Sequence, residues 1–212
     1  MGRALPKLDM MRSVELHFHL LPGVASLRTA LSAAGIPLEV RCGGELDAAV
    51  AGALTRRELD TIAQGPRGAR WLLLETPFEG ISPVLGEVAD ELRACGFGIV
   101  LAHPERSADV IHDGATGVMR EVAAGATLQV TAGSLLGDHG PEARAAAWRL
   151  VTCNLPLLVS SDAHGPTRPP ALTDARRVLA ARLGDQRARQ LCVRIPRRLV
   201  ARGLRHDLLV AA

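Results

Sequence analysis

Residues 99–106 read Ile-Val-Leu-Ala-His-Pro-Glu-Arg, an apolar run of four residues followed at once by imidazole and charged side chains. Short, continuous apolar runs are typical of buried parallel strands, and α/β folds carry their chemistry where such strands end. The same arrangement recurs along the chain, since five apolar runs each lead into a residue that can bind a metal. The five predicted strands are Val14–Leu16, Leu38–Val40, Trp71–Leu74, Ile99–Ala102 and Leu157–Ser161.

Seven side chains that follow these strands are candidates for one shared metal centre. They are His17, His19, Glu45, Glu75, His103, Asp162 and His164. In the His-x-His and Asp-x-His pairs both side chains share one face, because side chains alternate along an extended chain. Glu75 ends an otherwise uncharged run, where a carboxylate needs a cationic partner. Mixed imidazole and carboxylate ligands suit Mn, Fe or Zn better than Ca.

The segments between these strands predict helices and one further strand. The helices are expected over residues 27–34 (ended by Gly35), 45–54, 83–94, 116–124 (ended by Gly125), 142–152 and 172–183, and the strand over residues 127–130. Such alternation indicates a parallel sheet with right-handed crossovers. Because the candidate ligands come from so many strands, we expect a distorted TIM-like (β/α) barrel. An open sheet would gather its site at one switch point.

Length and composition are those of one ordinary domain. We expect an N-terminal extension over residues 1–13 and a single domain over residues 14–212, a size at which one hydrophobic core suffices. No apolar stretch approaches the ~20 residues of a membrane helix, and residues 1–13 have no apolar core of a secretory signal. The four cysteines are widely spaced, which is typical of reduced thiols. These features predict a cytoplasmic protein without membrane insertion.

The formal net charge of +3 does not indicate a nucleic-acid partner. Lys7 is the only lysine, and many arginines lie on helix-like segments, where they are interpreted as solvated faces. Tyrosine is absent and aromatic residues make up 2% of the chain, so platforms for stacking single-stranded bases are lacking. The charge is interpreted as mild attraction to anionic substrates.

The candidate ligands favour two divalent ions and a phosphate ester as substrate. One ion is assigned His17, His19, Glu75 and Asp162, and the second is assigned His103 and Glu45, with Glu75 as a bridge and His164 beside them. Two ions about 3.5–4 Å apart suit an in-line displacement at phosphorus. Arg106 and Arg168 follow His103 and His164 by three and four residues, and are predicted to bind the phosphoryl oxygens, because guanidinium groups bind phosphate through paired N–H donors.

A cysteine-dependent mechanism is a rival interpretation, because Cys192 and Arg198 have the C-x5-R spacing of phosphatases that use a thiolate nucleophile. Their phosphate loop needs inward-pointing N–H groups, whereas Pro196 has no N–H and Val193 and Ile195 are stiff. We interpret the segment as the start of a C-terminal helix. His139 is interpreted as a turn residue, and Gln129 and Ser134 as partners of residues behind the ligands.

Six blocks of the sequence carry a family resemblance. They are His17-x-His19 with Leu21-Pro22-Gly23, Gly44-Glu45, Leu74-Glu75-Thr76-Pro77, Ala102-His103-Pro104-Glu105-Arg106, Gly133-Ser134-Leu135-Leu136-Gly137, and Ser161-Asp162-Ala163-His164 with Arg168-Pro169. With these blocks the chain resembles the CpsB-type bacterial protein-tyrosine phosphatases of the polymerase and histidinol phosphatase (PHP) superfamily. The resemblance implies a distorted barrel, a cluster of divalent metals, and hydrolysis of phosphotyrosine on a tyrosine kinase of capsule or exopolysaccharide synthesis. Mn is the favoured metal, with Fe, Zn and Mg as alternatives.

The chain departs from this family pattern near its N-terminus. Residues 24–27 (Val-Ala-Ser-Leu) stand where the family has an acidic pair, and Ala34-Gly35 leads almost directly to Ile36, where the family has a further βα unit with a histidine. We therefore expect one βα unit fewer and at most two metals. The alternative functions are a weakened PHP domain that binds or regulates, and a phosphoesterase for a small molecule such as histidinol phosphate. An oligomer stays open.

Overall fold

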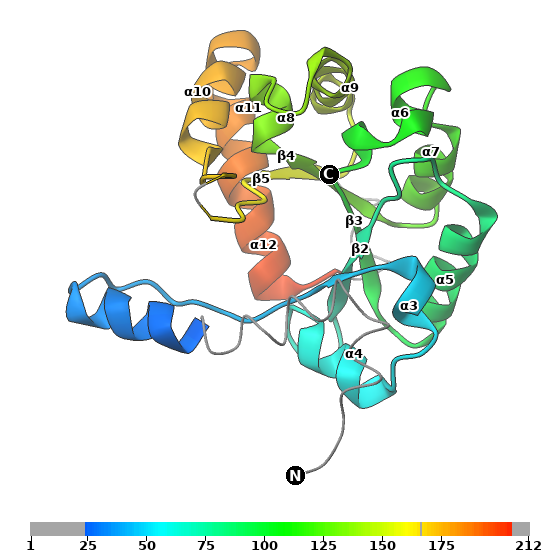
Figure 1. The fold of residues 1–212 in the computed structure, drawn as a ribbon, viewed down its shortest axis with the longest axis horizontal. Coiled ribbons are helices and arrows are strands. Elements are labelled where there is room, and N and C mark those ends of the chain that lie inside the picture. Colours follow the sequence, from blue (N-terminus) through cyan, green and yellow to red (C-terminus); the bar gives the residue numbers. More distant parts are fainter. Residues whose placement is uncertain (1–23, 166, 205–212) are drawn as a thin grey trace.

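A five-stranded parallel sheet forms the centre of the molecule (Figure 1). The computed structural model describes residues 24–165 and 167–204. The sheet has the order β1-β2-β3-β4-β5, with strands Glu45–Leu46, Trp71–Glu75, Gly98–Ala102, Thr127–Thr131 and Leu157–Ser160. Each strand therefore lies beside the next one in sequence, as in a barrel, whereas a doubly wound sheet reverses its order at a switch point.

The sheet is open, and the closed barrel predicted from the sequence is not confirmed. Among the described residues β1 and β5 are its edges. The predicted strand Val14–Leu16 lies outside the described residues, so the question of closure rests on the sequence alone. Four predicted strands are confirmed, and each of their bounds agrees to within one residue. They are β2, β3, β4 and β5.

The prediction for residues 38–54 is wrong in detail. Residues 36–44 have no regular structure, and Ile36 and Leu38 are exposed, so this apolar run does not enter the sheet. Glu45 itself begins β1, and the helix that follows starts only after Asp47, whose side chain accepts a hydrogen bond from the backbone of Ala49. The run is apolar, but no described strand pairs with it, so its side chains stay exposed.

The helices connect the strands and pack mainly on one face of the sheet. They are α3 (Ala48–Ala51), α4 (Arg56–Ile62), α5 (Pro83–Ala94), the 3-10 helix η1 (Pro104–Arg106), α6 (Ala108–His112), α7 (Thr116–Ala123), α8 (Ala132–Leu136), α9 (Pro141–Thr152), α10 (Leu172–Leu183), α11 (Asp185–Arg189), the π-helical turn η2 (Gln190–Arg194) and α12 (Ile195–Arg202). Residues 24–33 are also helical and end at Gly35, with φ 66°, as predicted. In Figure 1 this helix extends away from the sheet. No helix among the described residues is both long and apolar enough to cross a membrane.

The two faces of the sheet have different partners. Leu72 and Leu74 of β2 are fully buried in the main core with the helices that connect the strands. Leu73, on the opposite face, packs with Val100 and Leu158 against Leu199 of α12 in a second, smaller cluster. Period-two alternation along each strand explains this division. The C-terminal helix thus covers part of the face that carries Glu75.

A buried ion pair on the helical side gives a test of stability. Arg93 Nη2 lies 2.6 Å from Glu121 Oε2, and the two side chains are 11% and 1% exposed. Arg93→Ala would leave a carboxylate in the interior without its cation, so we expect a loss of about 3–5 kcal/mol in the free energy of unfolding. Urea titration measures it. Arg177→Ala, which breaks an exposed pair with Asp174, should cause a much smaller loss, and equal losses would contradict this account.

Candidate active site

Strand ends bring the candidate ligands to one edge of the sheet. Glu75 is the last residue of β2 and His103 follows β3 directly. Glu45 pairs in register with Leu73, so Glu45 and Glu75 lie on the same face of neighbouring strands. The edge is therefore the carboxyl end of the parallel strands, on the face that α12 partly covers.

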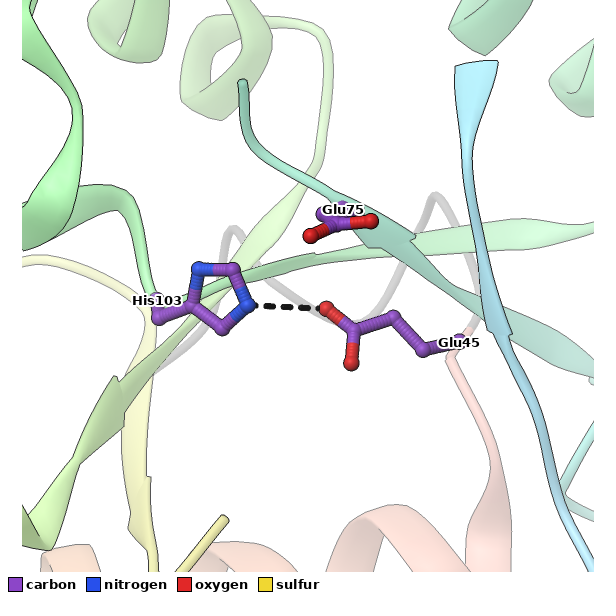
Figure 2. Close-up of side chains that lie close together, drawn as sticks. All are labelled: Glu45, Glu75 and His103. Atoms are coloured by element: carbon purple, nitrogen blue, oxygen red, sulfur yellow. Dashed lines mark ion pairs between the residues drawn. The ribbon is translucent and has the colours of Figure 1, made fainter. Parts of the chain in front are cut away.

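Glu45, Glu75 and His103 form a compact group (Figure 2). One donor atom from each residue lies within 4.8 Å of the others. His103 Nε2 is 2.9 Å from Glu45 Oε1, and His103 is almost fully buried. Glu45 Oε1 is buried and has no well-directed hydrogen bond among the described residues. An imidazole and two carboxylates that converge in this way fit a divalent cation.

The electrostatics of the group disfavour two ionised carboxyl groups side by side. Burial raises the pKa of the Glu75 carboxyl, and the neighbouring charge of Glu45 raises it further. Burial disfavours the charged form of His103, but the adjacent Glu45 outweighs this and holds the pKa of His103 above its ordinary value. Two carboxylates this close repel one another, so a bound cation would stabilise the group.

Two candidate ligands have an unusual backbone conformation. Three non-glycine residues in the described part have positive φ, and these include His103 at 35° and Asp162 at 49°. Such a conformation costs free energy, and it is concentrated at functional sites. The side chain of Gln129 accepts a hydrogen bond from the backbone N–H of His103 at 3.1 Å, which helps to hold this turn. This contact supports the predicted role of Gln129 as a partner of a residue behind the ligands.

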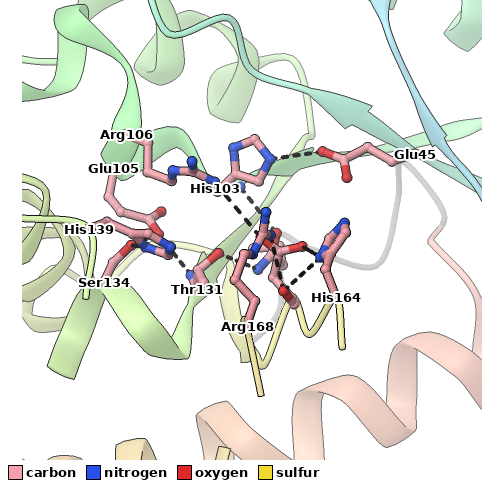
Figure 3. Close-up of polar contacts among 11 residues, drawn as sticks. Glu45, His103, Glu105, Arg106, Thr131, Ser134, His139, His164 and Arg168 are labelled. Carbon is pink, nitrogen blue, oxygen red and sulfur yellow. Dashed lines mark hydrogen bonds and ion pairs between the residues drawn. The ribbon is translucent and has the colours of Figure 1, made fainter. Parts of the chain in front are cut away.

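Arg106, His164 and Arg168, which are labelled in Figure 3, form a second cluster around Asp162. Arg168 Nη2 contacts the Asp162 carboxylate and donates to the Asp162 carbonyl oxygen at 3.0 Å. His164 Nδ1 lies 3.0 Å from the same carbonyl oxygen. Arg106 Nη1 is 3.9 Å from Asp162 Oδ2, and its guanidinium stacks over the Phe78 ring with 4.6 Å to the centroid. Both arginines predicted to bind phosphate therefore gather at one carboxylate.

The predicted site residues thus fall into three sets. Glu45, Glu75 and His103 lie in one group. Asp162 and His164 lie in the second cluster with both arginines, and among the described residues they do not join the first group. His17 and His19 lie outside the described residues. The roles of all seven as metal ligands, and of Arg106 and Arg168 in catalysis, stay predictions.

Residues 78 and 105 belong to this region but had no predicted role. The Phe78 ring stacks on His103 at 5.9 Å between centroids and also contacts Arg106. Glu105 is fully buried, and its Oε1 accepts hydrogen bonds from the Thr131 backbone at 2.8 Å and from Ser134 Oγ at 2.7 Å. Burial raises the pKa of Glu105, and these two bonds oppose the shift. The sequence signal that could have drawn attention to Glu105 is its charge, which lies shortly after a predicted buried strand.

The cysteine-dependent alternative does not fit the structure. Cys192 lies in η2 and Arg198 in α12, so the segment is helical and forms no phosphate loop. Burial raises the pKa of the Cys192 thiol to about 11, which keeps it from forming a thiolate. The predicted C-terminal helix is confirmed.

Replacing this thiol tests its role directly. Cys192→Ser should leave phosphatase turnover within a factor of about two, because the thiol is buried in the main core and the change replaces only its sulfur. The measurement is hydrolysis of an aryl phosphate at equal metal content. A loss of turnover with the metal retained would revive the cysteine mechanism.

Nearly the whole chain matches one known protein family. The model for capsular polysaccharide synthesis proteins of the CpsB/CapC type matches residues 4–201. The chain belongs to the CpsB/CapC family. This confirms the resemblance seen in the sequence motifs.

Two curated relatives of this CpsB/CapC protein carry the sequence comparison. It is 32% identical over 173 residues to the tyrosine-protein phosphatase YwqE of Bacillus subtilis (strain 168), covering 81% of this chain and 59% of YwqE. It is 33% identical over 107 residues to the CapC protein of Staphylococcus aureus, covering 50% of this chain and 42% of CapC. The chain thus spans about half the length of these relatives.

The fold of this CpsB/CapC protein is shared with a solved relative. The match is to a crystal structure from work on YwqE of Bacillus subtilis and CpsB of Streptococcus pneumoniae, described as unique metal-dependent tyrosine phosphatases. The TM-score is 0.66 at 26% identity, over 89% of this chain and 75% of the other. The α/β architecture is therefore that of this group.

Proposed function

We propose that this protein is a metal-dependent phosphatase that hydrolyses phosphotyrosine on proteins. The observation that carries the proposal is the convergence of Glu45, Glu75 and His103 at one edge of the sheet. These three possible metal ligands come from β1, from β2 and from the turn after β3. The relatives YwqE and CpsB, described as metal-dependent tyrosine phosphatases, support it. The proposed ligand set is completed by His17, His19, Asp162 and His164.

Each part of the site has a proposed task. Bound divalent ions, which we propose are two Mn ions, would supply charge for the phosphoryl oxygens and an activated water. Arg106 and Arg168 bind the equatorial oxygens, and their present contacts with Asp162 show that both reach one anionic group. Phe78 holds the Arg106 guanidinium by stacking on it. Gln129 and the buried Glu105 keep the strand-end turns in place.

The proposed substrate and setting follow from the family. The family description, capsular polysaccharide synthesis, supports a tyrosine kinase of that process as the protein substrate, in the cytoplasm. A weakened domain with a binding or regulatory role is the second candidate. The sequence departures near residues 24–36 favour it, because the third metal of the family draws on residues that this chain lacks.

A metal and substrate assay separates these functions. Purified protein is expected to hold at most two tightly bound divalent ions per chain by elemental analysis, and to hydrolyse a phosphotyrosyl peptide faster than a phosphoseryl peptide. Excess EDTA should abolish hydrolysis, and added Mn should restore it. Turnover that survives full metal removal would overturn the proposal. Tight peptide binding without turnover would instead support the binding role.

A further inference from the structure

A cavity of about 390 Å³ lies beside the proposed phosphate site. Its walls include Phe78, Arg106, Ile111, His139 and Pro141. Arg106 supplies a cation at one side, and the aromatic and aliphatic side chains supply apolar surface. A group with an anionic end and a flat apolar body matches this lining, and the aryl phosphate of the proposed function has that form.

His139 enters this cavity from the turn between α8 and α9, and its ring is anchored from behind. Its Nδ1 lies 3.0 Å from Ser134 Oγ. Ser134 Oγ donates its proton to Glu105 Oε1 at 2.7 Å. Because a hydroxyl has one proton, the contact with His139 requires Nδ1 to carry a hydrogen and to donate it to Ser134. Nε2 is then the ring nitrogen left for a ligand in the cavity that His139 lines.

The anchor is rigid because it is buried. Glu105 and Ser134 are both fully buried, and Glu105 also accepts the Thr131 backbone N–H at 2.8 Å. A Cβ added at Gly133 would lie 3.2 Å from His139 Cε1, so the imidazole packs closely over the start of α8. A side chain held by packing and hydrogen bonds in this way is preorganised for a defined contact.

We propose that His139, positioned by Ser134 and Glu105, donates the proton from Nε2 to the leaving phenolic oxygen of an aryl phosphate bound in this cavity. The inference rests on the proposed function and assigns a residue to its leaving-group step. Water forms the new P–O bond and keeps its protons on the product, which forms in the site as H₂PO₄⁻ and leaves as HPO₄²⁻ once it has given up one of them. The bond between phosphorus and the phenolic oxygen breaks, and that oxygen takes the Nε2 proton to give neutral phenol. The phosphate product then returns a proton to His139.

The charges around His139 fit this cycle. The groups that act on it are Arg106, Arg168, Asp162 and Asp138. Partial burial and then the two arginines lower the pKa of His139 in the free protein. A bound phosphate dianion would neutralise both arginines, and the chain from Ser134 to Glu105 places an acceptor behind Nδ1. Substrate binding therefore favours the protonated ring at the moment when a proton is needed.

The test compares leaving groups in His139→Gln, whose amide lies near the position of Nε2 but cannot transfer a proton. The substrates are a phosphotyrosyl peptide, whose phenolate leaves poorly unless protonated, and nitrophenyl phosphate, whose anion leaves readily. General acid catalysis is worth about 10²–10⁴-fold. We expect kcat on the peptide to fall at least about 10²-fold and kcat on nitrophenyl phosphate to fall less than about tenfold. Ser134→Ala should show the same difference in smaller degree.

The matched control is His112→Gln, an exposed histidine on the neighbouring α6, which should leave both rates unchanged. Metal content and melting temperature are measured for each variant, so that a folding defect is recognised. An equal fall on both substrates, or no fall on either, would overturn the role of His139. A wild-type protein inactive on both substrates with metal bound would instead count against the proposed function itself.

Discussion

His103→Asn is expected to remove both the bound metal and the phosphatase activity. His103 is buried, contacts Glu45 at 2.9 Å, and lies with Glu75 in the compact donor group. Metal catalysis of phosphoryl transfer contributes several kcal/mol, so turnover should fall by at least about 10²-fold. Elemental analysis and aryl phosphate hydrolysis measure the two losses on the same sample.

The choice of asparagine keeps the backbone of this turn intact. His103 has φ 35°, and asparagine tolerates this left-handed conformation better than most residues. The loss then reports on the imidazole and not on strain. His112→Asn, at an exposed position in α6, is the control and should retain metal and activity. Full activity and metal content in His103→Asn would remove His103 from the ligand set.

Arg106→Ala is expected to lower kcat by about 10²–10³-fold without loss of metal. The guanidinium lies over Phe78, is 3.9 Å from Asp162, and lines the cavity beside the proposed phosphate site. Removing it takes away charge that would stabilise the phosphoryl oxygens in the transition state. Steady-state kinetics with an aryl phosphate and elemental analysis together test the prediction.

Two further variants sharpen this test. Arg106→Lys keeps the charge but loses the planar pair of donors and the stacking on Phe78, so it should recover only part of the activity. Arg57→Ala, at an exposed position on α4, should have no effect. Should Arg106→Ala change KM alone, with kcat unaltered, Arg106 would be a substrate-binding residue without a part in the transition state.

Most of the secondary structure could be predicted because local pattern and tertiary structure agree. The run Trp71–Leu74 became β2 of residues Trp71–Glu75, and helix α5 has the predicted bounds Pro83–Ala94. The predicted strand Leu38–Val40 failed for the opposite reason. An apolar run becomes a strand only when it finds a partner, and Ile36 and Leu38 remain exposed.

Much of the candidate site was also predictable, because parallel strands end at one edge. This rule alone brings Glu75 next to the turn that carries His103. It could not show that Glu45 begins its strand and does not follow it, nor that Asp162 lies with the arginines in a cluster separate from the donor group. Those distances depend on the stagger of strands and on turn conformations with positive φ.

The sequence by itself determined the alternation of β2 to β5 with helices, the family, and the placement of Glu75 and His103 at neighbouring strand ends, because these depend on local periodicity and on residue types. Only the tertiary structure decided which side chains support others. The bond from Ser134 to Glu105 spans 29 residues, and the contact with His139 gives a role to a residue that looked like part of a turn. Helix α12 likewise packs against β3 and β5 on the face opposite the main core. Such contacts join segments distant in the chain, and their geometry arises from packing around the sheet.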